Sequence, residues 1–458
     1  MQNGERTQIT GSCGPHGRFV IGVDRLHHRA QEPARCTSPY TTRNMMQTVW
    51  SSIGRVRSLP VASCAAAARS TRSVSWRGSR STFATRSDAI PTTTTAFYVE
   101  NHGQPEKVLR LGHIALPPLQ PDHVLVRMLA APVNPSDINA IQGVYPVPLV
   151  PAARVTDSTP VSVPGFEGVA QVVAVGDCVT DPYAPQPGDW VIPDTAGFGT
   201  WRAHAVVPAT DVAVVRRAKS NSELQVAAAA SLSVNPTTAY RLLRDFAHLE
   251  EGDTVVQNAG NSAVGRYVIQ LARSMGVRTV NLVRDRKDFD SLADDLTRLG
   301  ATAVLRDGTG ELRAYMRDHA TNAKVAFNSV GGKSATELLR ALAPGGTHVT
   351  YGAMAREPMA VPASLLIFKD VRIRGFWMTE WKKRASVNER DAMMRDLVEK
   401  FATGELVTPH LNEIAVPTAE GVGDGEVEKV VQAIAEAGTG YLGKKQMLVF
   451  AAPSPSRA

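Results

Sequence analysis

The stretch DTVVQNAGNSAVGRYVIQLARSMGVRTVNLVRDR, residues 253–286, decides the fold of this chain. A short β-branched run at 254–257 predicts a strand, and small or turn-forming residues follow at 259–265. Apolar residues then recur at helical spacing, and a second apolar run at 277–283 predicts another strand. The result is a βαβ unit whose first turn would let a pyrophosphate approach the backbone at a helix N-terminus.

The first turn matches the dinucleotide-binding fingerprint only in part. Gly260, Ser262 and Gly265 occupy its three glycine positions, so a serine stands where the phosphate comes closest. The surrounding strand and helix fit the motif, and that context favours a dinucleotide site. A structural turn that binds nothing is the alternative.

The end of the second strand reads Arg284-Asp285-Arg286-Lys287. A site for NAD has a carboxylate here for the ribose 2′-hydroxyl, whereas guanidinium groups suit a 2′-phosphate because they bind its oxygens in pairs. These residues therefore predict NADPH in preference to NADH, although Asp285 could contact a ribose. A solvated basic turn is the alternative interpretation.

The positive charge of the chain is concentrated at its beginning. The chain has 458 residues and a net charge of +7, but residues 1–93 carry 13 Lys+Arg and four Asp+Glu. The remainder has 37 basic and 39 acidic residues, so the basic character belongs to a leader. The composition gives no support for nucleic-acid binding.

Residues 46–86 hold seven arginines, many serines and alanines, and no acidic residue. This composition is typical of a cleaved organellar transit peptide and predicts the mitochondrial matrix. Translation could also begin at Met45 or Met46, and a basic tail without an address is the alternative. No apolar run approaches the length of about 18 residues that a membrane span needs.

Cysteine is sparse. Cys13, Cys36 and Cys64 lie in the leader, so only Cys178 belongs to the predicted folded part. That part cannot form an internal disulfide or a cysteine-rich zinc site. We expect Cys178 to be a small buried hydrophobe.

The pattern after residue 96 divides into two kinds of region. Short strands at 97–101, 124–133, 168–176, 189–193 and 201–207, separated by Pro/Gly turns, predict an antiparallel β domain that forms a partly open barrel. Helices and strands then alternate to about residue 377, which predicts a doubly wound α/β domain. Two more helices and a strand at 446–450 close the chain.

This order resembles the medium-chain dehydrogenase/reductase superfamily and, within it, the mitochondrial 2-enoyl thioester reductases. The resemblance covers about residues 96–450. The matching segments are NPSDINAIQGVYP (134–146), PGFEGVAQVVAVG (164–176), SVNPTTAYRLL (233–243), QNAGNSAVGRYVIQLAR (257–273), VRDR (283–286), NSVGGKSATELLR (328–340), TYGAMA (350–355) and LLIFKDVRIRGFWMTEWKK (365–383).

The resemblance implies an α/β fold with a GroES-like catalytic domain and a Rossmann domain for NADPH. We expect a leader at 1–93, the first part of the catalytic domain at 94–234, the NADPH domain at 235–378, a return to the catalytic domain at 379–451 and a loose tail at 452–458.

The sequence argues against a catalytic zinc. Zinc-dependent members of the superfamily place a histidine where this chain has Phe166, and no cysteine stands near 134–137. Tetrahedral zinc sites need sulfur and nitrogen donors that this region does not supply. We therefore expect no metal, and polarisation of the substrate by hydrogen bonds.

Tyr145, in the loop Gln142-Gly143-Val144-Tyr145-Pro146, is the candidate catalytic residue. The resemblance implies that it donates the proton after a hydride from the nicotinamide reaches the β-carbon of an α,β-unsaturated thioester. A phenol, with a pKa of about 10, is protonated at neutral pH and suits this task. A tyrosine packed on a surface loop is the plainer interpretation of the residue alone.

The resemblance assigns the remaining site residues position by position. Asn235 would contact the nicotinamide, and Lys445 would close the site from the tail. The pyrophosphate would be lined by Asn261, Ser262, Ala263 and Val264; the adenosine phosphate by Arg284, Asp285 and Arg286; the nicotinamide ribose and acyl pocket by Tyr351, Gly352, Ala353, Met354, Phe376, Trp377, Met378 and Thr379. Met354, Phe376 and Met378 could equally be ordinary core residues.

A basic run at Lys382, Lys383 and Arg384, with Arg372 and Arg374 upstream, would lie beside the pocket. Such a rim could dock an acidic acyl carrier protein that presents the thioester, with a coenzyme A thioester as the other donor. A solvated basic face is the more common cause of such a run. The resemblance also implies a homodimer formed by edge pairing of the NADPH-domain sheets.

Two other functions stay open from the sequence. One keeps the fold and replaces the substrate by a quinone or an alkenal. The other is a non-catalytic nucleotide-sensing or transcription-partner protein, which the serine at the middle glycine position would favour.

Overall fold

The computed structural model describes residues 90–149, 153–155, 159–319, 321–417, 424–438 and 443–450. The predicted transit peptide and the predicted tail at 452–458 lie outside these ranges. Within them, no helix combines the length and apolar character needed to cross a membrane.

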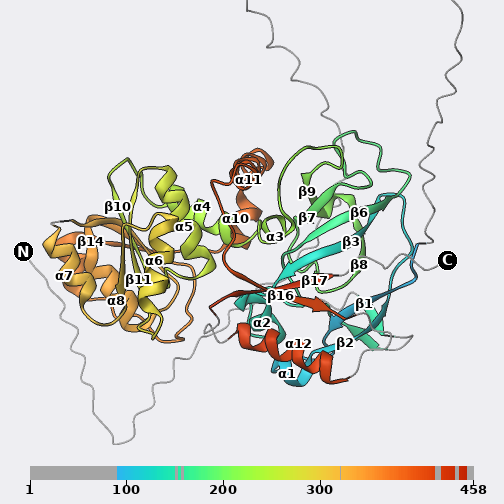
Figure 1. Ribbon diagram of the computed structural model, residues 1–458, viewed down its shortest axis with the longest axis horizontal. Helices are drawn as coiled ribbons and strands as arrows, with labels where there is room; N and C mark the ends of the chain where they lie inside the picture. Colours follow the sequence, from blue (N-terminus) through green and yellow to red (C-terminus); the bar gives the residue numbers. More distant parts are fainter. Residues whose placement is uncertain are drawn as a thin grey trace, which may run out of the picture. The chain divides into compact units, whose positions relative to one another are not determined.

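A six-stranded parallel sheet is built around the quoted βαβ unit (Figure 1). Its strand order is β12-β11-β10-β13-β14-β15, which is the doubly wound arrangement that the sequence predicts. The strands are β10 (Thr254–Gln257), β11 (Arg278–Val283), β12 (Ala303–Arg306), β13 (Ala323–Asn328), β14 (Leu342–Thr350) and β15 (Arg372–Gly375). Helices cover both faces: α4 (Asn235–Asp245), α5 (Ala263–Ser274) and α6 (Phe289–Leu299) on one, and α7 (Glu311–Asp318), α8 (Gly332–Ala341) and α9 (Ala363–Lys369) on the other.

Two neighbouring residues in the middle of β10 show that the strand is buried on both faces. Val255 packs in one core cluster with Leu242 of α4 and Val268 of α5, while Val256 packs in another with Leu312 and Leu338. Successive side chains point to opposite faces, so a strand covered on both faces presents apolar side chains to each of them.

A second sheet has the order β16-β17-β3-β6-β7-β9, with β8 paired to β3. Its strands are β3 (His123–Pro132), β6 (Val169–Val175), β7 (Trp190–Pro193), β8 (His204–Pro208), β9 (Val212–Arg216), β16 (Leu411–Val416) and β17 (Lys445–Phe450). Segments from before and after the six-stranded sheet thus meet in one sheet. The prediction of an antiparallel domain holds except that β16 and β17 are parallel.

The smaller elements complete the described chain. They are the pairs β1 (Thr93–Tyr98) with β2 (Arg110–Ala115) and β4 (Ala153–Val155) with β5 (Thr159–Val161), the helices α1 (Pro105–Val108), α2 (Pro135–Ile141), α3 (Val226–Ala230), α10 (Met378–Arg384), α11 (Val387–Ala402) and α12 (Asp424–Ala437), and the 3₁₀ turn η1 (Ala209–Asp211).

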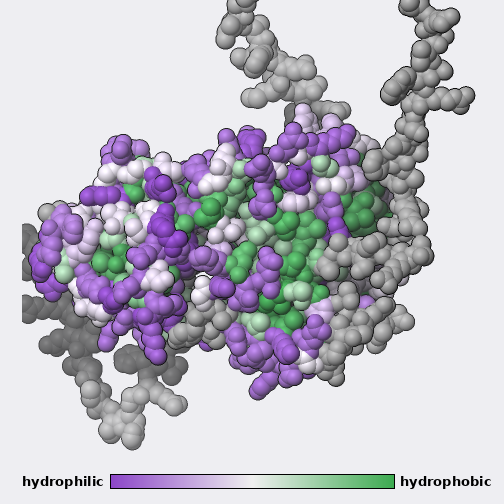
Figure 2. Space-filling view, viewed as in Figure 1, coloured by the Kyte–Doolittle hydropathy of each residue, from purple (hydrophilic) through white to green (hydrophobic). Residues whose placement is uncertain are grey.

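One apolar core joins the two sheets. Val169 and Ile192 of the seven-stranded sheet belong to the same buried cluster as Leu242, Val255 and Phe327. Helix α11 contacts both α4 and β9. Figure 2 shows hydrophobic side chains gathered over the seven-stranded sheet near β3 and β17, whereas hydrophilic side chains cover the region of α7.

The prediction that Cys178 is buried is wrong. It lies in the turn after β6 and is exposed. The amide of Cys178 donates to the carbonyl of Pro121, so the backbone of this turn is anchored while its side chain faces outward.

We predict that Val255→Ala destabilises the protein by about 2 kcal/mol, because two buried methyl groups are lost at about 0.8 kcal/mol each and a cavity remains. The matched control is Val407→Ala, since Val407 is 47% exposed while Val255 is 0% exposed. Urea unfolding followed by circular dichroism measures both variants. Equal losses of stability would contradict the packing described.

Candidate active site

A single cavity of about 1300 Å³ collects the predicted site residues. Of the 18 residues that the sequence nominates, all but Asp285 and Arg286 line it. Those that do are Tyr145, Asn235, Asn261, Ser262, Ala263, Val264, Arg284, Tyr351, Gly352, Ala353, Met354, Phe376, Trp377, Met378, Thr379 and Lys445. The cavity has room for a dinucleotide together with a second ligand, since drug-sized ligands occupy roughly 300–1,000 Å³.

The serine in the dinucleotide motif is the N-cap of α5. The hydroxyl oxygen of Ser262 accepts a hydrogen bond from the amide of Gly265 at 3.1 Å, and its carbonyl accepts one from Arg266 at 2.9 Å. The amides of Ala263 and Val264 lie in the first helical turn, where no intrahelical acceptor exists. An anion can bind there.

Gly260 and Gly265 of the motif are required because neighbouring atoms lie too close to leave room for a side chain. A Cβ on Gly260 would lie 2.8 Å from Cβ of Asn281 on β11, and a Cβ on Gly265 would lie 2.6 Å from the carbonyl oxygen of Gly260. These distances are too short for any side chain. The turn, the helix and β11 therefore pack as tightly as in a dinucleotide-binding unit.

The charged residues after β11 separate in the structure. Arg284 lines the cavity. Asp285 instead pairs with Arg306 at 3.3 Å, and Arg286 pairs with Asp288. Arg284 is thus the member of this group that faces the cavity.

Tyr145 reaches the cavity from the loop after α2, and its ring contacts two aromatic neighbours. Its hydroxyl oxygen accepts a hydrogen bond from Nε1 of Trp377 at 3.0 Å. The ring of Trp377 stands edge-on to it, with 6.2 Å between centroids, and Phe166 lies 5.5 Å away. Because Trp377 acts as donor, the phenolic proton of Tyr145 is left for another acceptor.

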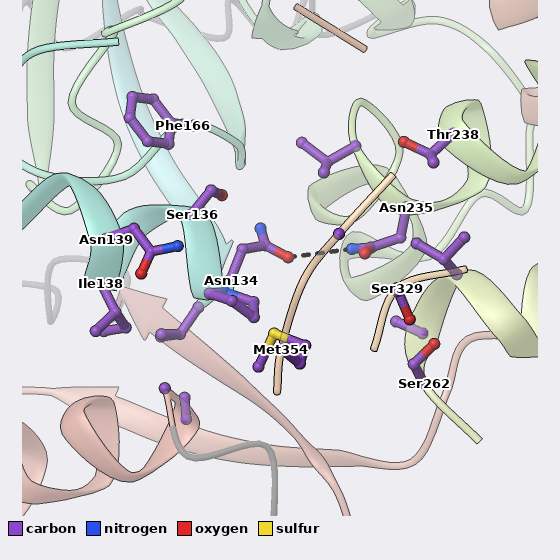
Figure 3. A pocket seen from close by; sticks show the side chains of 18 of the residues that line it. Asn134, Ser136, Ile138, Asn139, Phe166, Asn235, Thr238, Ser262, Ser329 and Met354 are labelled. Carbon is purple, nitrogen blue, oxygen red and sulfur yellow. Dashed lines mark hydrogen bonds between the residues drawn. The ribbon is translucent and has the colours of Figure 1, made fainter. Parts of the chain in front are cut away.

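A buried polar cluster lies beside Tyr145 at the floor of the cavity. Asn134 donates to Oε1 of Glu167 at 2.7 Å, and Lys445 donates to Oδ1 of Asn134. Asp137 accepts from the amides of Asn134 and Phe166 at 2.8 and 3.0 Å and so ties the two loops together. Figure 3 shows Asn134 and Asn235 facing each other, with Ser262 and Ser329 beyond them.

Burial dominates the electrostatics of this cluster. It raises the pKa of Asp137 to about 7 and raises the pKa of Glu167, while the positive charge of Lys445 opposes both shifts. Burial likewise lowers the pKa of Lys445, against the attraction of the two carboxyls. Groups of opposite charge are thus buried together, which is how proteins accommodate charge away from water.

The predicted basic run does not form one surface. Lys382 lines the cavity, and burial lowers its pKa while Asp194 and Glu167 oppose that shift. Lys383 and Arg384 are exposed and pair with Glu380. Arg372 and Arg374 lie on the exposed strand β15 and do not line the cavity.

The sequence analysis missed Glu167 and Asp194 as parts of the site, and it placed Lys382 on the rim of the pocket, whereas Lys382 lines the cavity. Glu167 directly follows Phe166, the residue that stands where zinc-dependent members of the superfamily have a histidine. A carboxylate next to that position was the one sequence signal that could have pointed to Glu167. Among the described residues, no group of three or more His, Cys, Asp or Glu side chains could hold a metal ion.

Comparisons with known proteins agree with this arrangement. Residues 120–217 match the family model of the alcohol dehydrogenase GroES-like domain, and residues 263–396 match that of the zinc-binding dehydrogenase. Over 330 residues the chain is 46% identical to the mitochondrial enoyl-[acyl-carrier-protein] reductase of Homo sapiens, which covers 71% of this chain and 83% of that relative.

Solved structures point to the same group. The Etr1p/NADP/crotonyl-CoA complex is 31% identical with a TM-score of 0.68, and the mitochondrial 2-enoyl thioester reductase Etr1p/Etr2p heterodimer from Candida tropicalis is 31% identical with a TM-score of 0.69. Each comparison covers 78% of this chain and 99% of the other. The fold is that of a medium-chain dehydrogenase/reductase. The chain belongs to the family of mitochondrial enoyl-[acyl-carrier-protein] reductases.

The phenol of Tyr145 gives a pH prediction. Burial raises its pKa, while the hydrogen bond from Trp377 opposes the shift. The folded protein therefore keeps a proton that the unfolded chain loses, and the associated stability is lost as pH rises through about 10 toward the folded pKa.

We expect the ¹³Cζ NMR resonance of Tyr145, assigned with Tyr145→Phe, to titrate at a higher pH than a tyrosine of the unfolded chain, whose pKa is about 10. Trp377→Phe should raise the pKa further, because it removes a hydrogen bond to the phenolate. Ionisation at a lower pH than in the unfolded chain would contradict the geometry.

Proposed function

We propose that this protein is an NADPH-dependent reductase of trans-2-enoyl thioesters that acts in mitochondrial fatty-acid synthesis. The observation that carries the proposal is a half-buried phenol, Tyr145, hydrogen-bonded by Trp377 at the same cavity as the anion-binding end of α5. In this proposal residues 94–234 and 379–451 form the catalytic domain, and residues 235–378 form the NADPH domain.

The cavity fits the dinucleotide on its own chemistry. The free amides of Ala263 and Val264 suit a pyrophosphate, and the close approach at Gly260 and Gly265 leaves no side chain in its way. Arg284 suits the 2′-phosphate, because a guanidinium donates to two phosphate oxygens at once. When bound, the reduced nicotinamide supplies a hydride to the β-carbon of the substrate.

Tyr145 would balance that hydride with a proton. Negative charge that develops on the thioester carbonyl oxygen is stabilised by the phenolic O–H, and the α-carbon then receives the proton. Nε1 of Trp377 donates a hydrogen bond to the hydroxyl oxygen of Tyr145. The hydroxyl proton of Tyr145 is therefore available to donate to the substrate. One such donor contributes about 2.7–4 kcal/mol to the stabilisation of an oxyanion transition state.

The acyl donor is proposed to be an acyl carrier protein, with coenzyme A thioesters also accepted. The printed names of the relatives specify the carrier protein, and crotonyl-CoA appears in the name of one solved complex. In this chain Lys383 and Arg384 are the exposed members of the basic run beside the cavity. Lys382 is left out of the docking surface because its side chain is turned into the protein and its pKa is lowered by burial.

The alternatives differ in what they need from Tyr145. A quinone can be reduced without a proton donor at a carbon atom, so a quinone reductase gains nothing from a phenol held by Trp377. A nucleotide-sensing protein does not need a catalytic phenol at all.

Tyr145→Phe should lower kcat for trans-2-hexenoyl-CoA by about 10²–10³-fold with little change in KM, because the donor acts only in the transition state. Loss of NADPH absorbance measures the rate. The control is Tyr183→Phe, since Tyr183 is 84% exposed and lies outside the cavity. Retained activity in Tyr145→Phe, or a wild-type protein that reduces quinones in preference to the enoyl thioester, would contradict the proposal.

Arg284→Ala should raise the Kd for NADPH by about 10–100-fold, since hydrogen bonds to charged groups contribute roughly 1.5–3 kcal/mol. The Kd for NADH should change little, because NADH lacks the 2′-phosphate. Quenching of nucleotide fluorescence measures both constants. The matched control is Arg317→Ala on α7, whose guanidinium pairs with Asp318 at the surface. An equal rise in the Kd values for NADPH and NADH would show that Arg284 does not contact the 2′-phosphate.

The protein is further proposed to form a homodimer through the edge of its six-stranded sheet. Strand β15 ends the strand order and is exposed along its length. On the preceding helix α9, Ile367 and Phe368 are 72% and 81% exposed, and Ile373 of β15 is 40% exposed. An unpaired edge strand beside exposed apolar side chains is a surface that a second copy would cover.

The double substitution Ile367→Asp with Phe368→Asp should convert the dimer into a monomer, because two charges would be buried in the interface. Size-exclusion chromatography with light scattering measures the mass. Val387→Asp on α11, a 59% exposed position, is the control. A wild-type monomer, or a dimer that survives the double substitution, would refute this surface.

A further inference from the structure

Glu167 is fully buried at the floor of the cavity and contacts two asparagines. Its Oε1 accepts hydrogen bonds from Nδ2 of Asn134 at 2.7 Å and from Nδ2 of Asn235 at 3.3 Å. Nδ2 of Asn235 also lies 3.3 Å from Oδ1 of Asn134, and Lys445 donates to that same oxygen (Figure 3 shows the contact between the asparagines).

These contacts determine which way each amide group faces. An ammonium group only donates, so the atom of Asn134 that meets Lys445 must be its oxygen, and its NH₂ then faces Glu167. Oε1 of Glu167 acts as an acceptor in either protonation state, because Oε2, which has no hydrogen-bond partner among the described residues, is the atom that would carry a proton. Asn235 must therefore also turn its NH₂ toward the cluster.

The oxygen of Asn235 is consequently directed away from the cluster. Asn235 lines the cavity, and within the described chain its Oδ1 takes part in none of the hydrogen bonds. The same cavity is lined by Ser262 of the anion-binding turn and by Tyr145. An acceptor at this place matches the N–H groups of a carboxamide.

We propose that Glu167 is a positioning residue, which holds the Asn235 amide with its oxygen toward the cavity and thereby sets the recognition of the cofactor's nicotinamide carboxamide. The inference rests on the proposed function, because it requires that a nicotinamide nucleotide binds here. Lys445 contributes by fixing the side-chain amide of Asn134, whose oxygen lies next to the NH₂ group of Asn235.

Glu167 differs in this respect from the other buried carboxyl. Asp137 is also 0% exposed, yet its oxygens accept from the backbone amides of Asn134 and Phe166 and make no contact with Asn235. Exchange of either carboxyl for an amide disturbs the buried charge, but only the exchange at Glu167 releases Asn235. Comparison of the substitutions at Glu167 and Asp137 therefore distinguishes a positioning role from a role in stability.

The test compares NADP⁺ with its 3-acetylpyridine analogue, in which a methyl group replaces the carboxamide NH₂. Isothermal titration calorimetry gives both Kd values. Wild-type protein should prefer NADP⁺ by about tenfold, the value of one hydrogen bond. Glu167→Gln should reduce the preference to about twofold or less, because a glutamine amide can also donate and so allows Asn235 to turn.

The control variants decide between positioning and a structural role. Asp137→Asn should lower the melting temperature and leave the preference for NADP⁺ unchanged. Glu167→Asp, which keeps an acceptor oxygen, should restore part of the preference. If Glu167→Gln does not fold, Asn235→Ala takes its place and should abolish the preference.

The outcomes separate the two proposals. Folded Glu167→Gln that keeps the full preference overturns the role of Glu167, as does a wild-type protein that binds NADP⁺ but does not distinguish the analogue. Wild-type protein that binds neither nucleotide overturns the proposed function itself.

Discussion

The hydrogen bond from Trp377 to Tyr145 connects parts of the chain that are 232 positions apart. Tyr145 belongs to the loop after α2, next to the seven-stranded sheet, whereas Trp377 follows β15, the last strand of the six-stranded sheet. The contact holds a half-buried phenol at a cavity that is also lined by the N-terminus of α5. Together with the shared apolar core, it brings the anion-binding turn and the proposed proton donor to one cavity.

The buried polar cluster occupies the place where a zinc site would be expected. Phe166 provides an apolar surface for the ring of Tyr145, and the next residue, Glu167, accepts hydrogen bonds from the side-chain amides of Asn134 and Asn235. Hydrogen-bond donors and acceptors fixed in a low-dielectric environment can stabilise charge that develops during a reaction, since they need not reorganise. The cluster and the phenol together offer such an environment.

The fold could be predicted to a large extent because its determining signals are local. The run at 254–257 and the helical spacing after Ser262 depend on a few neighbouring residues, and the structure confirms the βαβ unit that they indicate. Ser262 itself is explained by the preference of serine for the N-cap position, a preference that the glycine fingerprint conceals. The parallel pairing of β16 with β17 was not predictable, because it depends on where the chain returns to the sheet.

Site residues that belong to a sequence motif could be predicted, whereas those defined by burial and by contacts with distant residues could not. Tyr145 and Asn235 lie in segments that resemble a known family, and both line the cavity. Asp285 turned to Arg306, a partner 21 positions away that no local pattern reveals. Lys382 was grouped with its exposed neighbours because sequence shows charge but not the direction of a side chain. Glu167 could not be recognised because its hydrogen-bond partners, Asn134 and Asn235, are 33 and 68 positions away.

The central claim is that the cavity delivers hydride to a conjugated acyl group while a protein phenol supplies the proton. Reaction of crotonyl-CoA with NADPH deuterated at nicotinamide C4, followed by NMR of the product, tests it most directly. The account predicts deuterium at C3 of the saturated acyl group and solvent-derived hydrogen at C2, with both additions slowed in Tyr145→Phe. Deuterium at the carbonyl carbon, or its absence from the acyl group, would contradict the account.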